Sequence, residues 1–260
     1  MTSREVVDLI RKNLGVPWQE QTFRDTFKVG DPDAPIKGIA TTMMATYSML
    51  KRAAEANLNF IITHEDTYWN DRDDTKELTA NPLYIEKTEF AKKNGLVIWR
   101  MHDQMHNMKP DYTVSATLRV LGVKGAEAAA MQPHIYPVPE TTLGEFASQI
   151  KQRTGIRAIR CVGNPKAKVV KVLFGPGYAT PRMTPEADIV VGGESQEADG
   201  GFDNVEYVAD AASLGIDKSL IMLGHVVSEQ SGMVDMAPWL QTFIKGIPIQ
   251  FVAAEEPFWT

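Results

Sequence analysis

Three short apolar runs in this chain each end in a histidine. They span Asn59–His64, Leu96–His102 and Leu220–His225, and together with nearby His106 they hold four of the five histidines. A short run rich in Ile, Val and Leu is typical of a buried β-strand, whose last residue leaves the core. In open α/β sheets, ligands bind at the carboxyl ends of the strands. The pattern therefore predicts imidazoles gathered at strand ends, where they could bind a metal ion.

The order of helical and strand patterns predicts an α/β fold. Helical spacing over residues 3–14, 45–56 and 81–94 alternates with strand patterns at 36–40, 59–63 and from Leu96, which is typical of βαβ units. The same alternation returns later in the chain. Helices are expected at 143–154, 204–214 and 234–244, and strands at 156–162, 168–174, 188–191, 220–223 and 249–253.

A segment with three prolines, 131–139, separates the two stretches and is expected to be an extended crossing. The sequence therefore predicts two α/β halves, 1–130 and 131–260. Each half contains a helix, a short linker, an apolar strand and a histidine followed by an acid. This order is consistent with a duplication, although the identity between the halves is too low to establish a repeat.

Composition limits the partners that can be expected. A net charge of −6 over 260 residues, without a long basic cluster, argues against a nucleic-acid backbone or an anionic membrane. The amino terminus lacks the apolar core of a signal peptide, and no run approaches the roughly 18 residues that span a bilayer, so we expect a cytoplasmic protein. The single cysteine, Cys161, excludes an intrachain disulfide and is expected to be buried in a strand.

Ligand-type residues follow the apolar runs at regular spacing. His225 and Glu229 lie four residues apart, as do His102 and His106. If a helical turn begins after each strand, both members of a pair project from one face and can close on one ion. Imidazole and carboxylate together suit zinc, manganese, iron or nickel. Because either pair alone is more often an exposed helical pair, the inference depends on their coincidence at strand ends.

Two further acids join the predicted site. Glu65 follows His64 directly, and adjacent side chains of an extended segment diverge, so the two would bind different ions or opposite sides of one. Glu194 follows the strand pattern at 188–191 and is a candidate general base, although an ordinary loop carboxylate is an equally good interpretation. The set is large enough for two ions about 3.5–4 Å apart that share a carboxylate and a hydroxide, a standard hydrolytic arrangement.

With these residues assembled, the chain resembles the Nif-three-like family of dinuclear metal proteins, also known as the GTP cyclohydrolase 1 type 2 family. The similarity runs over nearly the full length and is most specific in Ile61–His64 and in the Gly-His-x-x-Ser-Glu motif of Gly224–Glu229. The resemblance implies two intertwined α/β halves with mixed sheets and a metal pair between them. It also implies a ring-shaped homohexamer.

Two positions depart from the family pattern. His64, His225 and Glu229 match family ligands, but Glu65 stands where the family has a second histidine, and His106 where it usually has an aspartate. The exchange keeps three imidazoles and two carboxylates. We therefore expect two retained metal sites with altered selectivity among metals, and a single-metal site is the competing outcome.

The first functional hypothesis is a hydrolase that uses a metal-bound hydroxide on a small substrate, either nucleotide-like or another heterocycle. It requires two divalent ions (Zn, Fe, Mn or Ni), with Glu229 as the bridge and Glu194 or His102 moving protons. The full set of predicted ligand residues is His64, Glu65, His102, His106, His225 and Glu229. The alternative hypothesis is a non-catalytic metal-binding ring that acts as a scaffold, metal chaperone or regulator.

Overall fold

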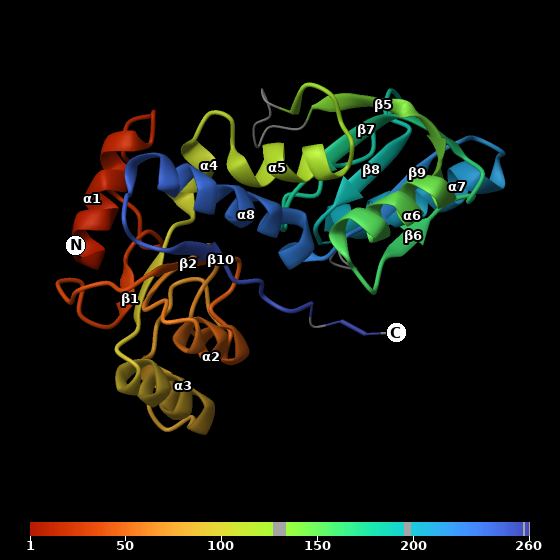
Figure 1. Cartoon of the computed structure of the whole chain (residues 1–260). Helices are drawn as coiled ribbons and strands as arrows, with labels where there is room; N and C mark the ends of the chain where they lie inside the picture. Colours follow the sequence, from red (N-terminus) through yellow and green to blue (C-terminus); the bar gives the residue numbers. More distant parts are fainter. Residues whose placement is uncertain (127–133, 195–198, 257, 260) are drawn as a thin grey trace. The chain divides into compact units, whose positions relative to one another are not determined.

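The computed structural model describes residues 1–126, 134–194, 199–256 and 258–259 (Figure 1). The chain divides into two compact units, the first made of Met1–Lys109 and Met233–Glu255, the second of Pro110–Gly232 and Glu256–Thr260. Each unit holds a five-stranded mixed sheet, so the predicted α/β class with mixed sheets is confirmed. The predicted junction at residues 130 and 131 lies outside the described residues, and the division into halves 1–130 and 131–260 stays a prediction.

The sheet of the first unit has the strand order β1-β4-β3-β2-β10. Its strands are β1 (Phe27–Val29), β2 (Ile39–Thr42), β3 (Phe60–Thr63), β4 (Val97–Arg100) and β10 (Ile249–Phe251). Four of them run parallel, and β1 pairs antiparallel with β4 at one edge. Thr63 of β3 lies opposite Arg100 of β4. The residues that follow these two strands therefore leave the sheet side by side, at the carboxyl ends of the parallel strands.

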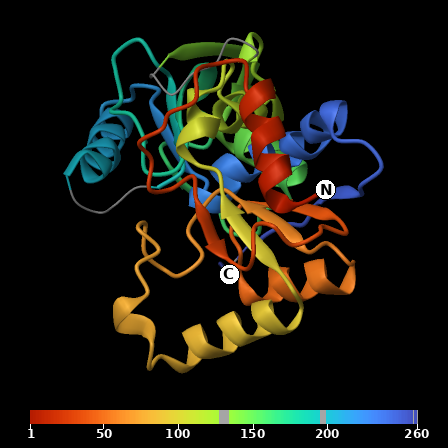
Figure 2. The same ribbon diagram turned by 90° about the vertical axis from the view of Figure 1, so that its left-hand side faces the viewer.

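Helices cover both faces of this first sheet. They are α1 (Ser3–Asn13), α2 (Tyr47–Glu55), the short 3-10 helix η1 (Lys76–Leu78), α3 (Pro82–Lys93) and α4 (Asp103–Asn107). Helices α2 and α3 lie on one face, and α1 and the later part of α8 (His225–Phe243) lie on the other (Figures 1 and 2). Leu50 of α2 and Ala91 of α3 belong to the same buried cluster as Ile61 and Ile98 of the sheet. On the α8 side, Thr41 of β2 donates a hydrogen bond to the carbonyl of Met233 at 2.8 Å.

The sheet of the second unit has the order β5-β7-β8-β9-β6. Its strands are β5 (Ile135–Thr142), β6 (Arg160–Val162), β7 (Lys168–Gly175), β8 (Ile189–Gly192) and β9 (Ser219–Met222). The three central strands are parallel, and the two edge strands are antiparallel to their neighbours. Gly175, Gly192 and Met222 lie side by side at the ends of the parallel strands. The segments after β7, β8 and β9 therefore meet at the carboxyl ends of these parallel strands.

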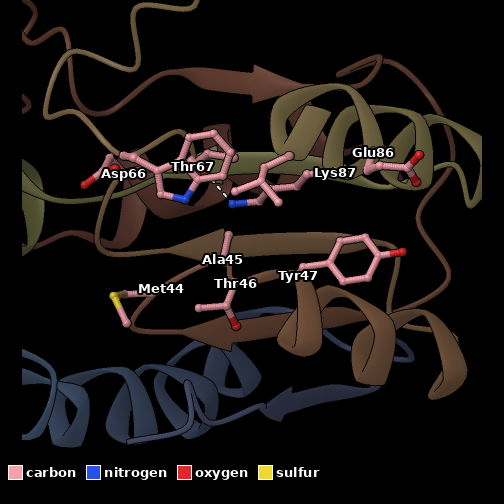
Figure 3. A pocket seen from close by; sticks show the side chains of 10 residues that line it. Met44, Ala45, Thr46, Tyr47, Asp66, Thr67, Glu86 and Lys87 are labelled. Atoms are coloured by element: carbon pink, nitrogen blue, oxygen red, sulfur yellow. Dashed lines mark hydrogen bonds between the residues drawn. The ribbon is translucent and has the colours of Figure 1, made fainter. Parts of the chain in front are cut away.

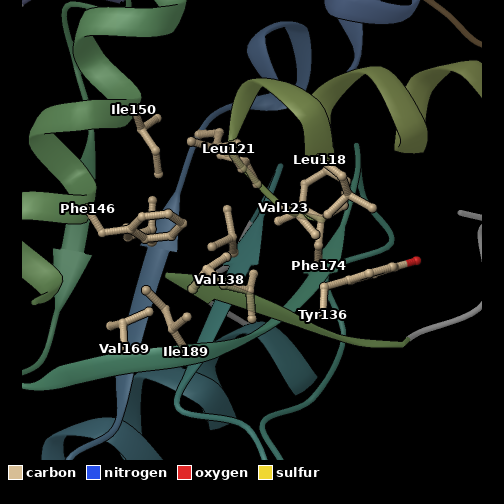
Figure 4. Close-up of a cluster of buried hydrophobic side chains, with 14 of the residues drawn as sticks. Leu118, Leu121, Val123, Tyr136, Val138, Phe146, Ile150, Val169, Phe174 and Ile189 are labelled. Carbon is tan, nitrogen blue, oxygen red and sulfur yellow. The ribbon is translucent and has the colours of Figure 1, made fainter. Parts of the chain in front are cut away.

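The core of the second unit follows the alternation of side chains along its strands. Its helices are α5 (Tyr112–Val120), α6 (Leu143–Thr154), α7 (Asp199–Ser213) and the first residues of α8. Leu118 of α5 and Phe146 of α6 pack with Ile189 on one face of the sheet (Figure 4). On the opposite face, Val208 of α7 packs with Val190. Alternate strand residues thus serve two separate apolar layers.

Most predicted elements are confirmed, with a few corrections. Helix α6 has the predicted bounds, and the proline-rich segment is extended from Ile135 onward, while residues 131–133 lie outside the described part. Helix α8 begins nine residues before the predicted 234–244, and β1 and α5 were not predicted. The expectation for Cys161 is wrong, because this thiol is exposed on β6, a three-residue edge strand. No helix in the described ranges is long and apolar enough to cross a bilayer.

Candidate metal-binding clusters

Three histidines gather at the carboxyl edge of the first sheet. His64 follows β3 directly, His102 precedes α4 and follows β4 by two residues, and His106 lies in α4. Their ring centroids are 4.6 Å apart for His64 and His102, 5.0 Å for His64 and His106, and 4.8 Å for His102 and His106. One ring nitrogen from each lies within 4.8 Å of the others, a grouping that could hold a metal ion. The predicted pairing of His102 with His106 is thus extended by His64.

Hydrogen bonds donated by Nδ1 orient two of these rings. The Nδ1 atom of His64 lies 3.1 Å from the carbonyl oxygen of Met101, and Nδ1 of His102 lies 2.9 Å from a carboxylate oxygen of Asp103. Because these oxygens only accept, the proton of each neutral ring is assigned to Nδ1. That tautomer makes Nε2 the metal-binding nitrogen. An acceptor behind the ring is the usual support of a metal-bound histidine.

The protonation state of His102 also suits a ligand. Burial lowers the pKa of His102 to about 4, with the positive charge that His106 would carry acting in the same direction and nearby Glu65 opposing it. The ring is therefore neutral at pH 7. Metal ions bind neutral imidazole, so this residue gives up no proton on binding near neutrality.

Arg100, at the end of β4, holds Glu65 in place. Its guanidinium group is fully buried, and Nη2 donates to Oε2 of Glu65 at 3.0 Å while Nε donates to the carbonyl of His64 at 3.0 Å. The other oxygen of Glu65, Oε1, lies 3.8 Å from Nε2 of His102. One carboxylate oxygen is thus anchored by a cation, and the other faces the histidine cluster.

Asp25 fixes the start of α4. Its buried carboxylate accepts hydrogen bonds from the backbone N–H groups of His102, Asp103 and Gln104, at 2.9, 3.0 and 3.2 Å. The free N–H groups at the beginning of a helix need such acceptors, and here a distant residue supplies one. Asp25, Asp103 and Arg100 were not identified from the sequence. Of these three residues, only Arg100 could have been noticed in the sequence, because it is a charged residue within an apolar strand pattern.

A second cluster lies within the second unit. His225 is the first residue of α8, Glu229 follows one turn later, and Glu194 follows β8. The Nδ1 atom of His225 lies 2.5 Å from Oε1 of Glu194, and Nε2 lies 3.2 Å from Oε2 of Glu229. The predicted helical pair is therefore present, and Glu194 contacts the far side of its imidazole. Nδ1 again faces an acceptor, and Nε2 faces another ligand-type residue.

The backbone around Gly177 closes on this second pair. Gly177 has a φ of +51°, and a Cβ atom added there would lie 2.6 Å from Oε1 of Glu229 and 2.9 Å from Nε2 of His225. Its N–H donates to the hydroxyl of Ser228 at 2.9 Å, and that hydroxyl donates to the carbonyl of His225 at 2.7 Å. Both the left-handed backbone conformation and the lack of space beside Glu229 and His225 therefore favour glycine at this position.

The predicted residues thus fall into two groups. His64, Glu65, His102 and His106 are together in the first unit, and Glu194, His225 and Glu229 are together in the second. The remaining histidine, His134, is exposed and packs edge-on against Tyr136. The assignment of these residues as ligands of one pair of ions stays a prediction.

Known proteins match this chain over nearly its whole length. The sequence profile of a family described as Duf34/NIF3 (NGG1p interacting factor 3) matches residues 1–257. Staphylococcus aureus protein SA1388 is similar in structure, with a TM-score of 0.76 and 15% identity, over 100% of this chain and 99% of that one. A Bacillus cereus protein related to NIF3 has a TM-score of 0.73 and 15% identity over 100% and 99% of the two chains.

A third similar structure is reduced HcgD from Methanocaldococcus jannaschii, with a TM-score of 0.66 and 14% identity over 97% of this chain and 98% of that one. At such identities the likeness shows the fold. No curated protein matches the chain.

Proposed function

Since this chain belongs to the Duf34/NIF3 family, we propose that it is a divalent-metal-dependent hydrolase acting on a small, nucleotide-like or other heterocyclic substrate. One observation carries the proposal. In His64, His102 and His225 alike, Nδ1 faces an oxygen acceptor, so that Nε2 is the nitrogen that would bind a metal. Three histidines supported in this way, with carboxylates beside two of them, form the donor set of a divalent-metal site.

The two clusters offer ligands for two ions, which we assign to zinc, iron, manganese or nickel because the donors are imidazoles and carboxylates. The ligands would be His64, Glu65, His102, His106, His225 and Glu229. When bound, the ions lower the pKa of water and stabilise negative charge that develops on the substrate. The resemblance to the GTP cyclohydrolase 1 type 2 family makes hydrolytic opening of a heterocyclic ring one reaction of this class to test.

The protein residues orient ligands and carry protons. Glu194 accepts from Nδ1 of His225 and keeps a side chain that is 38% exposed, so it can pass protons between the cluster and solvent. Arg100 holds one oxygen of Glu65 and keeps the other directed at His102. We assign Glu194 the role of proton carrier, and His102, with its ring nitrogen oriented by Asp103, that of a ligand.

Metal analysis of the purified protein tests the site directly. We expect one to two equivalents of metal per chain, with a loss of at least half in His64→Ala and in His225→Ala. His134→Ala is the matched control, because His134 is an exposed histidine outside both clusters. Unchanged metal content in His225→Ala would refute the assignment.

A screen for turnover tests the activity. Metal-loaded protein is incubated with nucleotides, phosphoesters, amides and lactams, and hydrolysis is followed by mass spectrometry. We expect turnover of at least one class, abolished in Glu229→Ala. Tight metal binding without any turnover would overturn the hydrolase and support a scaffold, metal chaperone or regulator. Light scattering on the same sample tests the proposed homohexamer, which requires a mass six times that of the chain.

A further inference from the structure

The first unit contains a cavity of about 520 Å³ beside the segment that follows β3 (Figure 3). One wall is the turn Met44–Tyr47 between β2 and α2, and the opposite wall comes from residues 66–69 and from α3. Apolar surface is supplied by Ala45, Trp69 and Leu83. Small-molecule pockets typically have volumes of about 300–1,000 Å³ and mainly apolar linings, so the cavity has the size and character of a ligand site.

The wall after β3 is fixed before any ligand binds. The carboxylate of Asp73 accepts hydrogen bonds from the backbone N–H groups of Thr67 and Tyr68 at 2.6 and 2.9 Å. Asp73 also pairs with Lys28 at 3.2 Å, and both side chains are almost fully buried. Trp69 has a φ of +62°, a left-handed conformation that this anchoring maintains. A preorganised wall reduces the entropy that a ligand must overcome on binding.

Two charged side chains give the cavity its polarity. The ammonium group of Lys87 donates to the carbonyl of Thr67 and lies 5.5 Å from the ring centres of Tyr68 and Trp69, so two of its three N–H groups remain for other acceptors. Asp66 lines the cavity and is partly buried. Within the described ranges, no side chain donates a hydrogen bond to Asp66.

The cavity therefore presents the carboxylate of Asp66, to which no side chain of the described residues donates, and the ammonium group of Lys87, which has two N–H groups left to donate. Its charged lining residues are Asp66, Glu86 and Lys87, which sum to a net negative charge. That balance disfavours an anionic ligand such as a phosphate. It favours a neutral or weakly basic ligand whose N–H groups can reach a carboxylate.

We propose that this cavity binds a planar nitrogen heterocycle that carries amino or ring N–H groups on one edge. The N–H groups donate to Asp66, an adjacent ring nitrogen or carbonyl accepts from Lys87, and the ring lies between the apolar walls. The assignment rests on the proposed function in one respect: the heterocycle is the recognised part of the hydrolase substrate. Asp66 directly follows the predicted ligand Glu65, so one segment carries both recognition and metal binding.

Isothermal titration of the metal-loaded full chain tests the proposal without turnover. The probe is 2,4-diaminopyrimidine, and the comparison compound is 2,4-dimethoxypyrimidine, which keeps the ring but lacks N–H donors. We expect the diamino compound to bind at least tenfold more tightly, because the partly buried carboxylate of Asp66 accepts charge-assisted hydrogen bonds only from it. Orotate, an anionic pyrimidine, should bind more weakly than the diamino compound.

Variants locate the binding. Asp66→Asn should weaken binding of 2,4-diaminopyrimidine at least tenfold, whereas Asp8→Asn, on the exposed face of α1, should not change it. Tyr47→Ala removes an exposed wall residue with little risk to folding and should weaken binding severalfold. Absence of binding, equal affinity for both neutral probes, tighter binding of orotate, or unchanged affinity in Asp66→Asn would each overturn the proposal. None of these outcomes alters metal content, so a failure here is distinguishable from failure of the proposed function.

Discussion

Replacing the buried Arg100 with methionine should destabilise the first unit and release a predicted metal ligand. The guanidinium group makes four interactions: with the carbonyls of His64 and Asp71, at 3.0 and 2.6 Å, and with the carboxylates of Glu65 and Asp71, at 3.0 and 3.1 Å. Methionine fills much of the same volume but donates no hydrogen bond. The acceptors around Arg100 would then lose their cation, and Glu65 would lose its anchor.

The expected cost follows from the burial of each partner. The carbonyl of His64 and the carboxylate of Glu65 lie in buried or mostly buried surroundings, and hydrogen bonds from a charged donor contribute about 1.5–3 kcal/mol each. The side chain of Asp71 is 51% exposed and can hydrogen-bond to water instead, so the loss of its contact with Arg100 adds little to the cost. Removing one partner of a buried ion pair costs about 3–5 kcal/mol. We expect Arg100→Met to lower the free energy of unfolding by about that amount.

Urea unfolding of chelator-treated protein measures this cost without the stabilisation that bound metal adds. Arg4→Met is the matched control, because Arg4 pairs with Asp33 at 2.7 Å, which is closer than the 3.0 Å between Arg100 and Glu65, but both side chains are largely exposed. The control should unfold near the wild-type urea concentration. If Arg100→Met unfolds at the same urea concentration as Arg4→Met, the reasoning from burial is wrong. Metal content measured on the folded variant should also fall, since Glu65 is no longer oriented.

Two further predictions concern single positions. Gly177→Ala should lower metal content while the far-ultraviolet circular dichroism spectrum stays native, because the added methyl group would press on Glu229 and His225; a native metal content would contradict the role of this glycine. Lys87 has a pKa lowered from 10.5 to about 8 by burial, so above pH 8 the folded chain releases this proton before the unfolded chain does. Relative to Lys87→Met, the free energy of unfolding of the wild type should therefore rise by up to about 3 kcal/mol between pH 8 and pH 10.5. Denaturant titrations across this pH range measure both proteins, and a constant difference between their free energies of unfolding would disprove the lowered pKa of Lys87.

The sequence predicted the residues that end strong local patterns. His64 and His225 could be identified because each ends an apolar run of the sequence, and Glu229 because helical spacing links it to His225. Asp25 could not be found in this way. Its role depends on hydrogen bonds to backbone groups nearly eighty residues later in the chain, which leave no local pattern.

The elements that were missed lack periodicity. In α5, every residue from Thr113 to Leu118 is buried, so no polar face marks the helix. Strand β1 has only three residues, and α8 shows little helical amphipathicity over its length, so its first nine residues were missed. Arg100 shows a pattern that can be searched for in other sequences. An arginine inside a buried strand must find hydrogen-bond acceptors, and here the acceptors lie beside the candidate ligands.

The two prolines of β5 have a consequence for self-association. Strand β5 is an edge strand that pairs on one side with β7 and contains Pro137 and Pro139. A proline within a sheet is accommodated where its missing N–H would point away from the neighbouring strand. The outer edge of β5 therefore lacks two of the donors that an incoming strand would need. This edge is therefore protected against the addition of a further strand from another chain and against the aggregation that such addition begins.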